Sequence, residues 1–116
     1  MKRALLLIGM LLAFNAQGQK VAVTVTGSDL AEHCSYIENK DSPLHWAACV
    51  WYVTAIADVM ALQPVGGWRA CIPMNGSGSQ YGKIVHKYFR EHPGQLHTAA
   101  FSAVARALSE AFPCKK

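Results

Sequence analysis

Hydrophobic side chains recur at helical spacing through most of this chain, and at strand spacing only near its beginning. Between residues 19 and 27, valines alternate with alanine and threonine, a period of two that predicts an extended arm with no strand beside it. A helix over residues 29–38 is expected next, with Ser28 as its N-cap. Its shared face consists of Leu30, His33, Cys34 and Ile37. The chain is therefore expected to change from extended to helical at Gly27.

The most apolar segment, residues 44–62, follows a strong helix start, in which the capping side chain of Ser42 precedes Pro43. A helix that is apolar all round either lies in a protein core or crosses a membrane. The segment is just long enough to span a bilayer, but Asp58 and an alanine-rich composition favour a central core helix. Trp46 and Trp51 on this helix are accordingly expected in the core.

Two further helices are separated from the first two by a long connection, residues 63–79, which is rich in glycine and proline. Ser77 and Gln80 form a capping box before an amphipathic helix at 79–91. Another apolar stripe predicts a helix over 94–112. The expected fold is an all-α, disulfide-stapled antiparallel bundle of four helices.

The first 18 residues have the pattern of an export signal. Lys2 and Arg3 precede an apolar run from Ala4 to Phe14, and small side chains at Ala16 and Gly18 suit a signal peptidase that cuts after Gly18. An exported mature chain of 98 residues is then expected, with an arm at 19–27 and a helical domain at 28–116. The run is too short for a membrane anchor. The mature net charge near +2 and the lack of a basic run argue against nucleic-acid binding.

Four cysteines, an even number, lie in the exported part, which predicts disulfides in an oxidising compartment. The cysteines are Cys34, Cys49, Cys71 and Cys114, and three pairings are open. Antiparallel helix pairs favour Cys34–Cys49 and Cys71–Cys114. No C-x-x-C pair supports a zinc site, and no C-x-x-C-H supports haem, so neither a metal nor a cofactor is expected.

Polar residues give little sign of catalysis. His33 and Cys34 are neighbours on a helix and point apart, so they do not make a nucleophile and its base. His92 and His97 flank a Pro-Gly break and make a poor metal site, while His45 and His86 are expected at the surface. Asp58 is predicted as a buried carboxylate to which Thr54 donates, with Arg69 or Arg106 as its charge partner. No carboxylate pair or catalytic motif was found, so we do not expect an enzyme.

Residues of the long connection are better suited to binding another protein. Tryptophan and arginine are favoured at interface hot spots, and the connection contains both. The residues predicted to contact a partner are Trp68, Arg69, Met74 and Asn75. The alternative is that Trp68 and Ile72 fold back over the core as a lid.

An ordered set of short motifs between Cys49 and Cys114 resembles a known family. The motifs are Trp51-Tyr52-Val53, Ala57-Asp58, Cys71-Ile72-Pro73, Gln80, Ile84-Val85, Tyr88-Phe89, His92-Pro93, Leu96-His97, Ala99-Ala100, Val104, Ala107-Leu108 and Ala111-Phe112-Pro113-Cys114. In this order they look like the Rap/Tai family of immunity proteins from bacterial type VI secretion systems. Trp51 and Ala55 depart from that pattern, which typically has glycine at both positions.

The resemblance implies a small helical periplasmic protein that binds a cognate toxin, often a peptidoglycan amidase, and blocks its active site without turnover. It also implies that two copies can form a homodimer. An alternative function is that of a periplasmic helical chaperone of the HdeA type, which would expose apolar surface on acidification.

Overall fold

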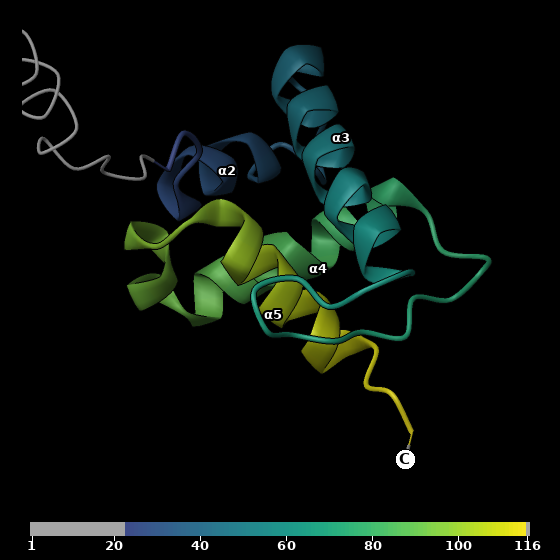
Figure 1. Cartoon of the computed structure of the whole chain (residues 1–116). Coiled ribbons are helices and arrows are strands. Elements are labelled where there is room, and N and C mark those ends of the chain that lie inside the picture. Colours follow the sequence, from purple (N-terminus) through teal and green to yellow (C-terminus); the bar gives the residue numbers. More distant parts are fainter. Residues whose placement is uncertain (1–22, 116) are drawn as a thin grey trace, which may run out of the picture.

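The computed structural model describes residues 23–115, which form an all-α domain of four helices and one short 3₁₀ helix (Figure 1). The elements are α2 (Gly27–Cys34), α3 (Pro43–Met60), α4 (Gly78–Glu91), η1 (Pro93–His97) and α5 (Ala100–Ala111). The predicted fold class is confirmed. The signal peptide predicted at 1–18 and residues 19–22 of the predicted arm lie outside the described residues.

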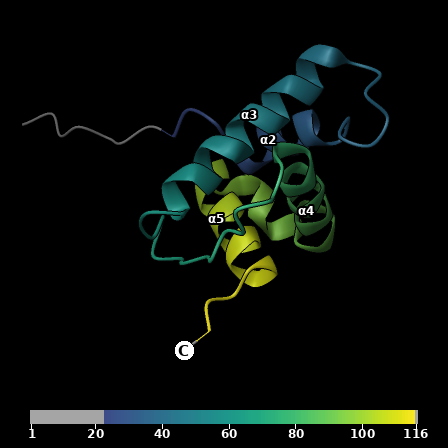
Figure 2. The same cartoon turned by 90° about the vertical axis from the view of Figure 1, so that its right-hand side faces the viewer.

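The core lies where α3 crosses α4 and α5, with α2 closing one end (Figure 2). Its most deeply buried large side chains are Leu30, Ile37, Val53, Val85, Val104 and Leu108. The fully buried disulfide Cys34–Cys49 joins α2 to α3, with its Cα atoms 4.9 Å apart. A second disulfide, Cys71–Cys114, spans 43 residues of sequence and fixes the long connection to the segment that follows α5. The pairing that the antiparallel helices favour is therefore the one present.

The start of α2 differs from the prediction. Thr26, not Ser28, is the N-cap: its hydroxyl accepts from the Asp29 N–H at 3.3 Å, and the Thr26 N–H donates to the Asp29 carboxylate at 2.9 Å. These hydrogen bonds stabilise the charged carboxylate and hold the pKa of Asp29 below its usual value. The helix ends at Cys34 and continues only as turns to residue 39, so the prediction of a helix over 29–38 was shifted.

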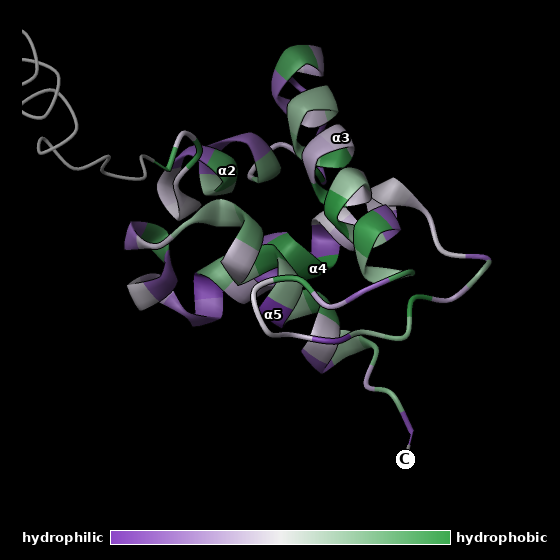
Figure 3. Ribbon diagram, viewed as in Figure 1, coloured by the Kyte–Doolittle hydropathy of each residue, from purple (hydrophilic) through white to green (hydrophobic). Residues whose placement is uncertain are grey.

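α3 begins as predicted, with Ser42 at the N-cap and Pro43 in the first turn, but it is not buried all round. Only one of its faces packs on the other helices, because α3 lies on the outside of the bundle rather than at its centre (Figure 2). Trp51 is 73% exposed, so its assignment to the core was wrong, while Trp46 is partly buried against the core. Figure 3 shows α3 as a mainly apolar ribbon along its length. Within residues 23–115, no helix has the length and hydropathy needed to cross a membrane.

The helix predicted over 94–112 is interrupted. Residues 93–97 form η1, the chain is extended at Thr98 and Ala99, and α5 begins at Ala100. The break allows the segment before α2 to pair with it: the Gly27 N–H donates to the Thr98 carbonyl at 2.8 Å, and the Ala100 N–H donates to the Val25 carbonyl at 3.0 Å. Tertiary hydrogen bonds thus outweigh the local helical pattern. They also give the end of the predicted arm a partner, which the sequence did not suggest.

Candidate partner-binding surface

The connection between α3 and α4, residues 61–77, is firmly held despite its length. Val65 and Trp68 exchange two backbone hydrogen bonds of 2.9 Å across a tight turn. Gly66 and Gly67 occupy that turn with φ of 57° and 83°, a left-handed conformation that favours glycine. Farther along, the Cys71 N–H donates to the Phe112 carbonyl at 2.8 Å, beside the disulfide. Cys71 therefore ties down the middle of the connection.

The tight turn presents an aromatic and cationic surface beside α5. The guanidinium carbon of Arg106 lies 5.1 Å from the centre of the Trp68 ring, a cation–π contact. A Cβ atom on Gly66 would lie 3.7 Å from the Phe101 ring, so Phe101 borders the turn. Trp68 is 37% exposed and Phe101 is 41% exposed. We name the surface made by Trp68, Arg69, Phe101 and Arg106 the loop face.

A tyrosine of α3 connects the loop face to the core. Burial raises the pKa of Tyr52, while a hydrogen bond with the backbone of Phe101 acts in the opposite direction. Because α5 has no side-chain cap at its first residues, this contact lies where backbone donors of the helix are free. Tyr52 therefore lies beside the start of α5.

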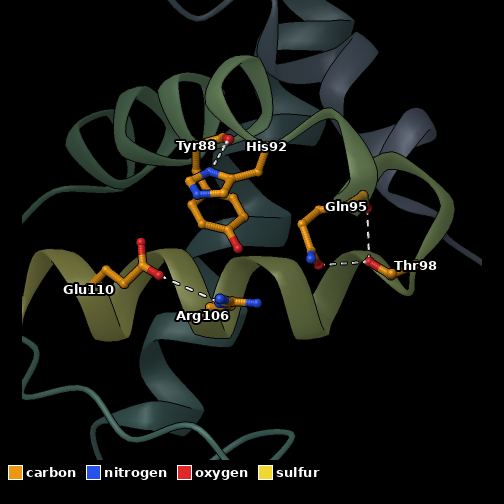
Figure 4. A network of polar contacts seen from close by, with 6 residues as sticks. All are labelled: Tyr88, His92, Gln95, Thr98, Arg106 and Glu110. Carbon is orange, nitrogen blue, oxygen red and sulfur yellow. Dashed lines mark hydrogen bonds and ion pairs between the residues drawn. The ribbon is translucent and has the colours of Figure 1, made fainter.

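The guanidinium group of Arg106 can donate more hydrogen bonds than Glu110 accepts. Its Nε lies 3.5 Å from the Glu110 carboxylate, close enough for attraction, but it is not aligned for a hydrogen bond. Figure 4 shows the Tyr88 ring directed from α4 toward α5, with its hydroxyl on the side of Arg106. That hydroxyl is buried and has no hydrogen-bond partner, and burial raises the pKa of Tyr88. An incoming carboxylate would give the guanidinium group the charge-assisted hydrogen bonds that Glu110 does not supply.

The four residues predicted to contact a partner do not form one cluster. Trp68 rests on α5, whereas Met74 and Asn75 follow Pro73, whose carbonyl accepts from the Tyr81 hydroxyl of α4 at 3.5 Å. Met74 is fully exposed, and Asn75 and Arg69 are exposed too. The structure thus places Trp68, at the tight turn beside α5, apart from Met74 and Asn75, which lie at the end of the connection near α4.

The sequence missed two residues of the loop face. Phe101 and Arg106 lie in the middle of an amphipathic helix pattern, and only the tertiary fold places them beside Trp68. The position of Phe101 could have suggested an exposed contact residue, because this large aromatic side chain lies outside the apolar stripe of its helix. Arg106 was one of two candidate charge partners of Asp58, with Arg69 as the other, but it lies beside Glu110.

A hollow of about 310 Å³ lies between the end of α3 and the connection. Its lining residues are Met60, Ala61, Leu62, Gln63, Arg69, Ala70, Cys71, Ile72 and Cys114. Arg69 therefore links the hollow to the loop face. Ile72 packs against the core and Ala70 is buried, so this part of the connection does cover the core, as the lid interpretation expects.

The predicted buried pair of Asp58 and Thr54 is not present. Asp58 is exposed, and no hydrogen bond joins it to Thr54, whose hydroxyl is buried without a partner. The helix turns Asp58 outward because its buried face is narrow. Cys34 is disulfide-bonded and unavailable as a nucleophile. Among residues 23–115, no three His, Cys, Asp or Glu side chains are grouped to hold a metal ion.

Two histidines expected at the surface are half-buried. His45 lies between α2 and α3, in contact with His33. Burial lowers the pKa of His86, and the positive charge of Arg90 lowers it further. Both rings lie on helix faces that are partly covered by neighbouring helices.

Comparison with protein families gives a clear match. The model of the Rap1a immunity proteins aligns with residues 26–114, from the N-cap of α2 to the last cysteine. No curated protein and no solved structure shows significant similarity to the chain. Because the family match covers most of the sequence and all the described helices, this chain belongs to the Rap1a immunity protein family.

Proposed function

We propose that this immunity protein acts in the periplasm, where it binds a toxin delivered by a type VI secretion system and blocks its active site. The proposed toxin class is a peptidoglycan amidase. The observation that carries the proposal is the family match over residues 26–114. Two disulfides in a domain of this size support an oxidising compartment such as the periplasm.

The loop face suits inhibition by occlusion. A protein that blocks an active site must present a surface that loses little conformational freedom on binding. The tight turn, the Cys71–Cys114 disulfide and the contact between Trp68 and Arg106 restrain this surface before any partner arrives. Exposed aromatic rings beside arginines have the composition of an interface hot spot.

The test of the proposal is protection of a sensitive bacterium. Amidase toxins would be directed one at a time to its periplasm, with and without this protein. Protection by the full chain, together with loss of protection when residues 2–18 are deleted, would support both the inhibitor function and the periplasmic location. Failure to protect against any amidase, or to form a complex with one on gel filtration, would contradict the proposed toxin class.

A Trp68→Ala, Arg69→Ala double variant should bind the toxin about 10- to 100-fold more weakly, the usual range for loss of hot-spot residues. Isothermal titration calorimetry would measure the affinity. The matched control is Met74→Ala, Asn75→Ala at the far end of the same connection, which tests whether the surface extends that far. Unchanged affinity in the first variant would remove the loop face as the contact surface.

We also propose that two copies pair through the outer face of α3. The stripe on this face runs through Leu44, Ala48, Trp51, Ala55, Asp58 and Leu62, at spacings of three or four as in helix–helix seams, and all but Asp58 are apolar. Leu44 is 84% exposed and Leu62 is 90% exposed, so neither has a partner within the described chain. In an antiparallel pair centred near Val53, Leu44 of one copy faces Leu62 of the other, Trp51 faces the small Ala55, and Asp58 faces Ala48 away from the centre of the seam. The stripe is thus complementary to itself, as a two-fold interface requires.

Trp51→Glu is expected to convert such a dimer to a monomer, because a carboxylate would be buried at the centre of the seam. Sedimentation velocity would measure the mass across a concentration series. Lys83→Glu, an exposed change on α4, is the charge-altering control. A monomeric wild-type protein at high micromolar concentration would contradict the pairing.

A further inference from the structure

Two histidines from different helices meet beside the buried disulfide. His33 lies in the last turn of α2 and His45 in the first turn of α3, and their Nδ1 atoms are 2.9 Å apart. The ring centres are 4.9 Å apart, and the Tyr36 ring stacks on His45 at 4.6 Å. Neither histidine belongs to the loop face or to the outer face of α3. We name this arrangement the histidine pair.

The fold fixes the histidine pair before any ligand arrives. Cys34 follows His33 directly, and Cys49 is one turn after His45, so the fully buried disulfide holds the two helix ends together. The stacked Tyr36 ring limits rotation of His45. Both rings are only half-buried, which leaves room for water beside them.

The spacing of the two Nδ1 atoms matches that of neighbouring ligands around one metal ion. Metal–imidazole bonds are about 2.0–2.1 Å long, so two bonds at a right angle place their nitrogens about 2.9 Å apart. A tetrahedral angle would require about 3.3 Å from the same bond lengths. Right angles are typical of Cu²⁺ and Ni²⁺ in tetragonal sites, and imidazole suits both ions.

The tautomers of the two rings also allow one ion to bind between the Nδ1 atoms. A hydrogen bond between two Nδ1 atoms requires one ring to carry its proton on Nδ1 and the other to leave Nδ1 bare. A bound ion would use both Nδ1 lone pairs and let both rings keep their proton on Nε2. The Asp29 carboxylate lies one turn before His33 on α2, and a nearby negative charge favours a cation.

We propose that His33 and His45 bind one Cu²⁺ or Ni²⁺ ion through their Nδ1 atoms, with water at the other coordination positions. The ion would join α2 to α3 next to the Cys34–Cys49 disulfide. Because the chain supplies two ligands here, the site is open and its affinity is moderate. This binding goes beyond the proposed toxin inhibition and does not depend on it.

Calorimetric titration of the untagged, oxidised protein with CuCl₂ and with NiCl₂ tests the proposal. One ion per chain is expected, with at least tenfold weaker binding in His33→Ala and in His45→Ala. His97→Ala, which removes an exposed histidine of η1, is the matched control and should bind as the wild type does. Wild-type affinity in either pair variant, or equal weakening in the control, would overturn the site.

Two further readouts separate the site from a general effect on folding. The melting temperature of the wild type should rise with added NiCl₂, because the ion binds the folded chain, and the pair variants should show no such rise. Electron paramagnetic resonance of the Cu²⁺ complex should show two coordinated ring nitrogens. A signal from one nitrogen, or a rise in melting temperature that persists in His45→Asn, would refute shared coordination.

Discussion

The Cys34→Ala, Cys49→Ala double variant is expected to lose about 4 kcal/mol of unfolding free energy. Restoring the freedom of the 15-residue loop in the unfolded chain costs about 3 kcal/mol on the chain-entropy model. Both side chains are fully buried, so their truncation also leaves a small cavity, which costs about 1 kcal/mol more. Urea unfolding followed by circular dichroism would measure the loss. The unfolding free energy of a domain of this size is small, so the variant should be close to unfolding at about 37 °C.

The other disulfide provides the matched comparison. Cys71 is exposed, so the Cys71–Cys114 bond should be reduced by dithiothreitol before the buried Cys34–Cys49 bond. Its loss should free the connection and the C-terminal segment while α2, α3 and α4 stay packed. Simultaneous reduction of the two bonds would contradict the protection of Cys34–Cys49 by burial. A loss of unfolding free energy under about 1 kcal/mol in the Cys34→Ala, Cys49→Ala variant would contradict its stabilising role.

Gly27→Ala should lower the unfolding free energy by about 3 kcal/mol, although the change adds a single methyl group. A Cβ atom at this position would collide with the carbonyl oxygen of Gln95 and lie 2.9 Å from the Cα of Leu96. Both atoms belong to the backbone of η1, which cannot rotate away as a side chain can. Relief would require η1 to shift, and the hydrogen bond from the Gly27 N–H to Thr98 would weaken. Urea unfolding measures this loss as well.

Gly94→Ala is the control for this prediction. Gly94 also lies near the contact, in η1, but a Cβ atom there would have no neighbour within 4 Å. The change should alter the unfolding free energy by less than about 0.5 kcal/mol, as at other open surface positions. Equal effects of the two substitutions would mean that the close approach of α2 and η1 does not constrain Gly27.

Local signals predicted the fold class and most helix boundaries. Ser42 before Pro43 and Ser77 before α4 act at short range, so they could be recognised without the tertiary structure. The capping box predicted at Ser77 and Gln80 is present in one direction, with the Gln80 N–H donating to the Ser77 hydroxyl at 3.2 Å. The amphipathic pattern that predicted α4 is present in the structure, where Tyr81, Val85, Tyr88 and Phe89 are buried along one face.

The wrong predictions concern features that depend on contacts between segments far apart in the sequence. The composition of α3 is apolar on every side, and composition cannot tell a central helix from an outer one whose free face lacks a partner. The break at Thr98 and Ala99 depends on hydrogen bonds to residues more than seventy positions earlier. The loop face likewise joins Trp68 to Arg106, which no local pattern connects.

The hydrogen bonds between residues 25–27 and residues 98–100 bear on how the chain acquires its structure. The two segments lie near opposite ends of the described chain, so a loop of more than seventy residues must close before they can pair. The α2–α3 hairpin closes a loop of 15 residues and can form early, whereas the hydrogen bonds of residues 25–27 form only once residues 98–100 are in place. Contacts of such long sequence separation slow folding because loop closure precedes any gain. The contact between the beginning of the domain and the segment before α5 is therefore among the last parts to become complete.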